Sequence, residues 1–237
     1  MVSIYDVVHS ELISKEVTQI VLRPSSESRL VYQAGQYLKI VHPDGKISPL
    51  SIANAPQENG LIELQLAHPA AYLLAQEILR FVAEEKKLIV RGPYGNCTAE
   101  KFSAQSHVIL LARGTGFAPI KAMLEEVQKN KKSPHIHFYW SVTSPEEFYL
   151  DELLAEWERV IPHFTYTPVL SRDYFQWQGR VGLLQKVVLE DYPEIARHWV
   201  YASAPESIVH DVLHALQERG LPRDQYYSDV FDYDARE

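Results

Sequence analysis

The feature that most constrains the fold of this 237-residue chain is a change in its hydrophobic pattern near residue 100. Before that point the chain consists of short β-rich segments, several of which alternate apolar and polar residues as half-buried strands do. Beyond it, compact apolar runs alternate with longer segments whose apolar residues recur at helical spacing. The change predicts two domains: an N-terminal antiparallel Greek-key β-barrel over residues 1–98 and a doubly wound parallel α/β domain over residues 99–237.

In the first domain, turn sequences separate the expected strands. Asp44-Gly45 and Asn59-Gly60 are each typical of a β-hairpin turn. One segment, residues 70–87, has the apolar spacing of a helix instead. The expected strands cover residues 4–8, 17–22, 36–41, 47–53, 62–66 and 88–91.

The second domain is expected to alternate strands and helices, an order that implies parallel strands with helices on both faces. The expected strands cover residues 107–112, 136–142, 164–170, 199–203 and 225–231. The expected helices cover residues 119–129, 146–158 and 205–219.

Composition excludes several classes of protein. With 46% hydrophobic residues the chain is not intrinsically disordered, and no apolar run approaches the roughly 18–20 residues of a membrane span. A single cysteine, Cys97, excludes internal disulfides and a four-thiolate metal site. The sequence pI of about 5.7 argues against a non-specific nucleic-acid binder. The N-terminus lacks the pattern of a signal peptide, so we expect a cytoplasmic protein.

The negative charge is concentrated in the second domain. Residues 1–98 carry 9 basic and 10 acidic side chains, whereas residues 99–237 carry 14 and 21. An anionic ligand of the second domain must therefore be held by local groups, such as backbone N–H groups at a helix start.

The segment Gly114-Thr-Gly116-Phe-Ala-Pro119 lies where an apolar strand is expected to pass into a helix. Glycines in such a turn let the backbone approach a diphosphate closely, and we expect a Cβ at Gly116 to project into the path of the phosphates. Pro119 suits a first helical turn. The third glycine of the usual dinucleotide fingerprint is missing, so the segment alone is also compatible with a connection that binds nothing.

Further motifs occur in a fixed order along the whole chain. They are Gly35-Gln-Tyr-Leu, Pro49-Leu-Ser51-Ile-Ala-Asn54-Ala-Pro56, Gly92-Pro-Tyr-Gly95, the glycine-rich turn above, Trp177-Gln-Gly-Arg-Val-Gly182 and Tyr227-Ser-Asp-Val-Phe231. In these motifs the chain resembles the ferredoxin–NADP reductase superfamily. Within it, the resemblance is to the NAD(P)H:flavin reductases and to the reductases of the CDP-6-deoxyhexose pathway. The superfamily's barrel and doubly wound domain agree with the pattern of strands and helices.

The resemblance implies an enzyme that transfers a hydride from NADH or NADPH to atom N5 of FAD or FMN. The flavin ring would lie between the domains, with Ser51 near N5 and Thr115 on the other side as the catalytic pair. Because the cofactors carry this reaction, the protein mainly has to align them. On the flavin side, the resemblance assigns cofactor binding to Ser48, Pro49, Leu50, Ser51, Ile52 and Asn54. On the nicotinamide side, it assigns Arg113, Gly114, Thr115, Gly116, Phe117, Pro119, Ser171, Arg172, Ser203, Ala204, Pro205 and Asp229, with Phe231 as a flap over the flavin.

Three departures weaken the implied flavin site. Ser48 stands where the family has an arginine that pairs with the flavin phosphate, a strong charge-assisted contact. Leu50 replaces an aromatic residue that stacks on the flavin. Ala71 stands where flavoprotein members often have a phosphate-contacting serine. We therefore expect the flavin to be held loosely, or to be a substrate.

The nicotinamide side departs as well. Arg113 replaces a small residue, and its side chain either reaches a phosphate or fills the space that a cofactor needs. The segment Ser203-Ala204-Pro205 lacks the family's cysteine. The absence of a basic residue after the second strand, at Thr143, favours NADH, whereas Ser171-Arg172 resembles a 2′-phosphate contact and keeps NADPH open.

Other candidate features have simpler interpretations. The pairs His135/His137 and His210/His214 each share one face of an element, but neither has an identifiable third ligand, so we expect no metal site. Cys97 is expected to be an inert loop thiol. For Asp229, an exposed turn carboxylate is the alternative to a site beside the nicotinamide.

Three functions remain open at this point. The chain is a reductase of free flavin, a flavoprotein that passes electrons to a separate iron–sulfur or oxygenase partner, or a non-catalytic binding member of the same fold. The losses at Ser48 and Leu50 count against retention of the flavin, which the second function needs.

Overall fold

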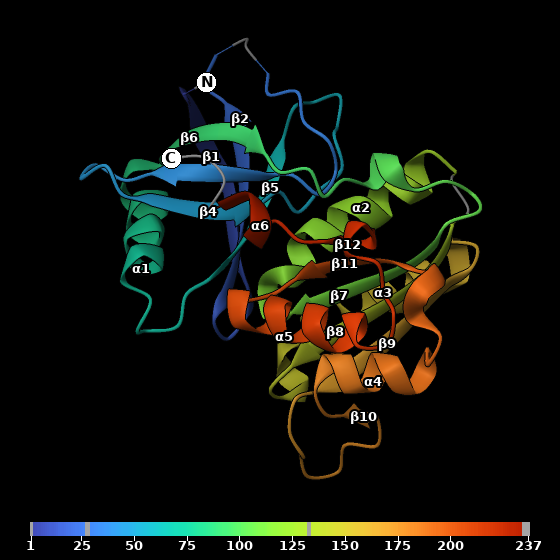
Figure 1. Ribbon diagram of the computed structural model, residues 1–237. Coiled ribbons are helices and arrows are strands. Elements are labelled where there is room, and N and C mark those ends of the chain that lie inside the picture. Colours follow the sequence, from blue (N-terminus) through green and yellow to red (C-terminus); the bar gives the residue numbers. More distant parts are fainter. Residues whose placement is uncertain (1, 27–28, 132–133, 234–237) are drawn as a thin grey trace.

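The computed structural model describes residues 2–26, 29–131 and 134–233. It contains two six-stranded sheets that lie side by side, one antiparallel and N-terminal, the other parallel and C-terminal (Figure 1). This arrangement confirms the predicted fold class.

The antiparallel sheet curls into a barrel because its two edges meet. Its strand order is β4-β3-β6-β1-β2-β5, and an isolated bridge between Ile52 and Leu64 joins the β4 edge to the β5 edge. Both of these side chains are completely buried in the barrel core. The strands are β1 (Val2–Ser14), β2 (Val17–Pro24), β3 (Tyr37–Val41), β4 (Ile47–Ser51), β5 (Ile62–Ala67) and β6 (Lys87–Tyr94).

One of the two expected hairpins is present. The β3–β4 hairpin turns at Asp44-Gly45, where Gly45 adopts the left-handed φ of 85° that such turns need. The second hairpin prediction is wrong. A turn forms at Asn59-Gly60, but β5 pairs with β2 along its length and meets the β4 edge only through the single bridge.

The helix expected over residues 70–87 is present but shorter and composite. It consists of α1 (Leu73–Arg80) followed by a π-helical turn, Phe81–Glu85, and it ends at Lys86, whose φ is 51°. Its apolar face, which includes Ile78 and Phe81, packs on the barrel core. The helix therefore covers one side of the barrel (Figure 1).

The parallel sheet has the order β10-β9-β8-β7-β11-β12. One hydrophobic cluster packs α2 and α3 against one face, and a second cluster packs α4 and α5 against the other. The domain is therefore doubly wound, as predicted. Its strands are β7 (His107–Arg113), β8 (His135–Val142), β9 (Phe164–Leu170), β10 (Arg180–Val181), β11 (Trp199–Ser203) and β12 (Tyr226–Tyr227). Its helices are α2 (Phe117–Lys129), α3 (Asp151–Val160), α4 (Leu184–Asp191) and α5 (Glu206–Gln217).

The strand expected over residues 225–231 is wrong beyond Tyr227. There the chain turns into a short helix, α6 (Val230–Tyr233). The Ser228 hydroxyl and carbonyl accept hydrogen bonds from the N–H groups of Val230 and Phe231, at 3.4 Å and 3.3 Å. Such local bonds give the backbone an alternative to a strand ladder, which explains the difference.

The helix expected over residues 146–158 begins later than predicted. A 3-10 turn over Pro145–Glu147 comes first, closed by a capping box between Ser144 and Glu147, and α3 starts at Asp151. The short strand β10 and the helix α4 were not expected at all.

A buried lysine joins the two domains. Lys121 of α2 donates hydrogen bonds to Glu125 (2.7 Å) on its own helix and to Glu63 (2.9 Å) and the Ala53 carbonyl (3.0 Å) of the barrel. Burial alone would lower the pKa of Lys121, but the two carboxylates outweigh it and the pKa is raised. Glu125 also accepts the N–H of Ala55 at 2.8 Å. This ion cluster fixes α2 against the barrel.

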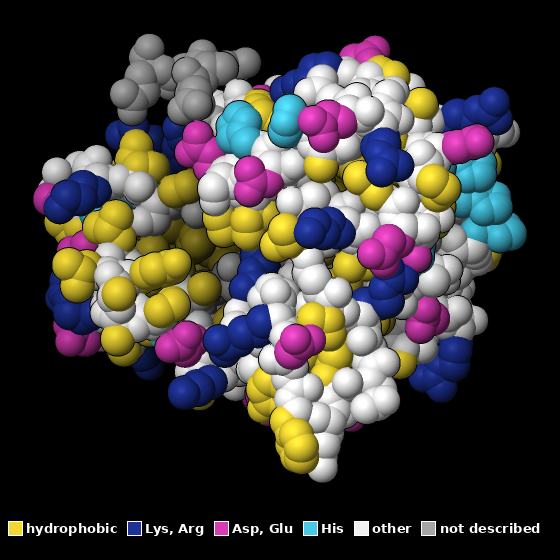
Figure 2. Space-filling view, turned by 60° about the horizontal axis from the view of Figure 1, so that its bottom comes forward, with side chains coloured by type: hydrophobic (Ala, Val, Ile, Leu, Met, Phe, Trp, Pro, Cys, Tyr) yellow, Lys and Arg dark blue, Asp and Glu magenta, His cyan; other side chains and the backbone are white. Residues whose placement is uncertain are grey.

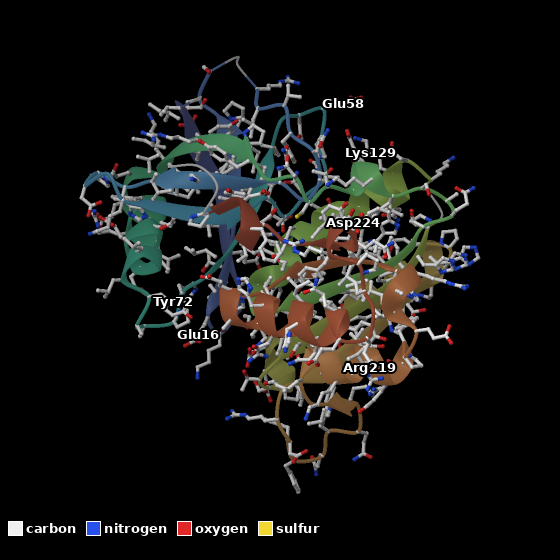
Figure 3. The ribbon with its side chains drawn as sticks, in the orientation of Figure 1. Glu16, Glu58, Tyr72, Lys129, Arg219 and Asp224 are labelled. Atoms are coloured by element: carbon white, nitrogen blue, oxygen red, sulfur yellow. The ribbon has the colours of Figure 1, made fainter. Side chains whose placement is uncertain are left out.

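A second lysine of α2 crosses the same interface near its edge. Lys129 donates to the Pro56 carbonyl at 2.7 Å. Figure 3 shows Lys129 and Glu58 on the two sides of this edge, both at the surface. Among the described residues, no helix is both long and apolar enough to cross a membrane.

We expect Lys121→Met to lower the free energy of unfolding by on the order of 3 kcal/mol, because it leaves the partly buried carboxylates of Glu63 and Glu125 without their cation. The control Lys129→Met removes one exposed hydrogen bond and should cost about 0.5 kcal/mol. Urea denaturation of the three proteins measures both values. Similar losses in the two variants would contradict the role assigned to Lys121.

Candidate active site

A cleft of about 890 Å³ opens between the two domains. Figure 2 shows the surface hollowed between the smaller and the larger lobe, with hydrophobic side chains in its depth. The barrel contributes the tip of the β1–β2 hairpin, the end of β4 and the connection from β5 to α1. The second domain contributes the carboxyl ends of β7, β8 and β11 with the turns that follow them. In doubly wound folds, ligands bind at this edge of the sheet.

The structure brings many of the expected site residues together in this cleft. Those that line it are Pro49, Leu50, Ser51, Arg113, Gly114, Thr115, Gly116, Ser203, Ala204 and Pro205. Ser51 and Thr115, the expected catalytic pair, therefore lie on the walls of one cavity, one from each domain.

The two glycines of the β7–α2 turn are required for different reasons. Gly114 has a left-handed φ of 55°, and a Cβ there would meet no atom within 4 Å. A Cβ at Gly116 would lie 1.9 Å from the carbonyl oxygen of Ser203. The expected reason for Gly116 is therefore wrong. Its missing side chain allows the turn to pack on β11 and is not directed at a phosphate path.

Ser48 faces away from the cleft. Its hydroxyl is hydrogen-bonded to Nε2 of the buried His42 at 2.9 Å, and Nδ1 of the same ring lies 2.7 Å from a Glu77 carboxylate oxygen of α1. The position that holds the family's arginine is thus occupied by an internal chain of hydrogen bonds.

Two other residues of the expected flavin segment hold the barrel together. Ile52 is completely buried. Asn54 is buried too, donates to the carbonyls of Ala55 and Leu61 at 3.1 Å each, and accepts the N–H of Glu63 at 2.7 Å. Neither residue lines the cleft.

Arg113 extends along the carboxyl end of β8. Its guanidinium donates to the Thr143 hydroxyl at 2.6 Å and lies 3.5 Å from the Ser141 hydroxyl. Burial lowers the pKa of Arg113, and the nearby Glu147 opposes that effect. The structure therefore supplies a cation beside Thr143, a position where the sequence has no basic residue.

Several expected residues lie outside the cleft lining. Phe117 is fully buried and stacks on Trp140, with ring centroids 4.5 Å apart. Phe231 packs beside His210 and Tyr226. Arg172 is exposed on the connection after β9. Ser171 and Pro119 are also absent from the lining.

Asp229 lies behind the cleft, in a small internal space that it shares with Cys97, Pro119 and Ser203. Its atom Oδ1 is buried and has no hydrogen-bond partner among the described residues. Burial raises the pKa of Asp229 to about 7, against a lowering by the Cys97 thiol. Burial also raises the pKa of the Cys97 thiol itself. The exposed-turn interpretation of Asp229 is therefore wrong for its carboxyl group.

Sequence reasoning missed several parts of the cleft wall. The hairpin tip from Ser14 to Val17 lines it, although no motif marked this segment. Gln65 and Tyr149 also line it and are hydrogen-bonded across the domain boundary at 2.8 Å. Glu146 and Glu147 contribute carboxylates to the cleft, and Glu147 is close enough to Arg113 to oppose the lowering of its pKa by burial. The capping-box pattern from Ser144 to Glu147 is the one local sequence feature that could have drawn attention to any of them.

The histidine pairs have other partners. His135 stacks between His107 and His163 at the surface, and His137 is hydrogen-bonded to Tyr192 and Thr167 at 2.8 Å each. Across the described part of the chain, no group of three or more His, Cys, Asp or Glu side chains is arranged to hold a metal ion.

Comparison with known proteins identifies the class. Residues 110–213 match the family of oxidoreductase NAD-binding domains. The chain is 30% identical over 221 residues to the CDP-6-deoxy-L-threo-D-glycero-4-hexulose-3-dehydrase reductase of Yersinia pestis, covering 93% of this chain and 66% of that protein. It is 29% identical to the probable flavin reductase of Photobacterium leiognathi, covering 85% and 87% of the two chains.

Among solved structures, the ferredoxin NADP+ reductase of Neisseria gonorrhoeae superposes with a TM-score of 0.76 at 17% identity, covering 96% of this chain and 97% of that one. The chain therefore has the fold of the ferredoxin–NADP reductases and, over residues 110–213, matches the oxidoreductase NAD-binding domain, in agreement with the sequence motifs. It spans just under two thirds of the length of the Yersinia reductase.

The two glycines of the turn make a matched pair for mutation. We expect Gly116→Ala to lower the free energy of unfolding by about 3 kcal/mol, since the methyl group would overlap a backbone atom of β11. Gly114→Ala should cost about 1 kcal/mol, because it introduces only left-handed backbone strain. Thermal and urea unfolding measure both. A larger loss for Gly114→Ala would overturn this assignment of the two positions.

The raised pKa of Asp229 predicts the direction in which the stability of the protein changes with pH. The folded protein holds a proton on Asp229 that the unfolded chain loses near pH 4, so this residue's contribution to stability falls as the pH rises from about 4 to about 7. Asp229→Asn should therefore gain stability relative to the parent between about pH 5 and pH 7.5. Urea denaturation at the two pH values tests this, and a constant difference would exclude a buried, protonated Asp229.

Proposed function

We propose that this protein is an NAD(P)H-dependent flavin reductase. One observation carries the proposal: Ser51 at the end of a barrel strand and the turn from Gly114 to Gly116 of the NAD-binding domain line the same cleft. We assign flavin binding to residues 1–98 and nicotinamide nucleotide binding to residues 99–237. The Photobacterium relative, whose name carries the same activity, supports the assignment.

In this function a flavin bound in the cleft supplies a two-electron acceptor and NADH or NADPH supplies the hydride. The backbone of Pro49 and Leu50 forms the wall for the flavin ring, and the Ser51 hydroxyl is available as a hydrogen-bond donor there. Thr115 orients the nicotinamide from the opposite wall. By holding the two rings in contact, these residues lower the barrier through proximity and orientation.

The same geometry supports a flavin that is held loosely. Ser48 is bonded to His42 and cannot contact a phosphate. Leu50 offers no aromatic face, and the exposed Ala71 offers no hydroxyl. We therefore propose that flavin is a substrate that exchanges with solution.

The acidic side chains at the end of β8 favour NADH over NADPH. Glu146 and Glu147 both line the cleft, and hydrogen bonds from Ser144 and Tyr174 lower the pKa of Glu146, so its carboxyl group is ionised at neutral pH. These charges would repel a 2′-phosphate, although Arg113 partly compensates them.

A second function is supported by the name of the Yersinia relative, which is the reductase of a dehydrase. In that case this protein would pass electrons from its flavin to a separate acceptor protein, such as an iron–sulfur or oxygenase component, and would have to retain the flavin during purification.

We expect the purified protein to be nearly colourless and to oxidise NADH only when FMN, FAD or riboflavin is added. Absorbance at the flavin band after gel filtration and NADH oxidation with and without flavin measure this. A stoichiometric flavin that survives gel filtration would favour the electron-transfer function. No NADH binding at all would favour a non-catalytic member of the fold.

Ser51→Ala should lower turnover with FMN by about three- to tenfold and change the Michaelis constant for NADH little, because it removes one hydrogen bond on the flavin side. The control Ser10→Ala alters an exposed serine of β1 that does not line the cleft. Steady-state kinetics compare the two variants with the parent, and equal turnover in all three would place Ser51 away from the flavin.

A further inference from the structure

We propose that Lys15, at the tip of the β1–β2 hairpin, contacts the 5′-phosphate of bound FMN and makes the cleft prefer FMN to riboflavin. The proposal rests on the flavin reductase function proposed above. It assigns the phosphate contact to a segment that none of the sequence motifs includes.

The hairpin tip is held at the cleft by defined contacts. The Glu16 carbonyl accepts the N–H of His68 at 2.8 Å, and the His68 ring is hydrogen-bonded to the Thr18 hydroxyl at 2.9 Å. Val17 pairs with Ala67 at the end of the β2–β5 ladder. These contacts attach the tip to the connection between β5 and α1, so Lys15 extends from an anchored backbone.

The tip lies beside the region that remains for the ribityl chain and its phosphate. On the barrel side, the cleft is lined by two segments, the end of β4 and the tip together with the β5–α1 connection. With the flavin ring against Pro49 and Ser51, and the nicotinamide against the second domain, we place the ribityl chain along the barrel wall toward the tip. Figure 3 shows Glu16 of the tip and Tyr72 of the connection beside one another on this side of the barrel.

The charge of the cleft points to the same residue. Among the described residues, the basic side chains that line the cleft are Lys15 and Arg113. Arg113 is already hydrogen-bonded to Thr143 on the nicotinamide side. The ammonium group of Lys15 has no hydrogen-bond or ion-pair partner within the described chain. Because Ser48 faces His42, Lys15 is the cation at hand for a phosphate on the flavin side.

The neighbouring residue Glu16 carries the opposite charge to Lys15, so the two positions test the charge effect in opposite directions. Glu16 also lines the cleft, and its carboxylate repels a phosphate dianion. Removing the lysine charge should therefore weaken FMN binding, and removing the glutamate charge should strengthen it. Riboflavin has the same ring and ribityl chain without the phosphate, so neither change should alter its binding.

The experiment is a titration of FMN and of riboflavin, followed by quenching of flavin fluorescence, with the parent, Lys15→Ala and Glu16→Gln. Lys15→Ala should raise the Kd for FMN about two- to fivefold, the scale of one solvent-exposed charge contact. Glu16→Gln should lower it by a similar factor. Both effects should shrink in high salt, because added ions screen exposed charges.

The control variant Lys87→Ala removes an exposed lysine of β6 that lies outside the cleft, and it should leave both flavin affinities unchanged. An unchanged Kd for FMN in Lys15→Ala would overturn the proposal. So would a parallel weakening of FMN and riboflavin, which would indicate a disturbed hairpin. If the parent binds neither flavin, the flavin reductase function itself fails, and that result is distinct from a parent that binds FMN without help from Lys15.

Discussion

The cation of Lys121 is the contact on which the two-domain arrangement depends. It is buried, it donates to both domains, and its two carboxylate partners come from opposite sides of the boundary. An ammonium group in this position is stable only while Glu63 and Glu125 both face it, so the ion cluster forms in one relative orientation of barrel and α2. That orientation also decides which residues of the two domains face each other across the cleft, including Ser51 and Thr115.

The two walls of the cleft differ in their charged side chains. On the wall formed by the second domain, Arg113 is hydrogen-bonded to Thr143 at the end of β8, and Glu147 lies near it. In the function proposed above, this balance of charges favours NADH over NADPH. On the barrel side, the position of the family's arginine is filled by the hydrogen-bonded chain of Ser48, His42 and Glu77. In the proposed function, a cleft without that charged contact suits a flavin that exchanges between turnovers.

Much of the fold follows from local sequence, because strands and helices with a regular apolar period bury one face whatever their neighbours are. The strand β7, the turn at Gly114 and the helix α2 were predictable for that reason, and so was their place at the carboxyl edge of a parallel sheet. The failures lie where side-chain bonds to the backbone or pairings with distant strands override the apolar pattern. Ser228 diverts the chain into α6, and β5 pairs with β2 instead of completing a hairpin at Asn59.

The same distinction applies to the cleft. Pro49, Ser51 and Thr115 belong to motifs, whereas Gln65, Tyr149 and Lys15 are brought to the cleft by pairings between distant segments that leave no local pattern. The reason for Gly116 also lay out of reach of the sequence, since the Ser203 carbonyl that excludes its Cβ lies 87 positions further along the chain.

The residues that line the cleft run from Ser14 to Tyr72 in the barrel and from Arg113 to Pro205 in the second domain. The binding surface therefore exists only after nearly the whole chain has folded and its halves have docked, so a partly synthesised chain offers no complete site to a flavin. A ligand that binds only the docked form adds its binding free energy to the docking of the two domains. Amide hydrogens on both sides of the boundary would then exchange more slowly together, even those far from the ligand.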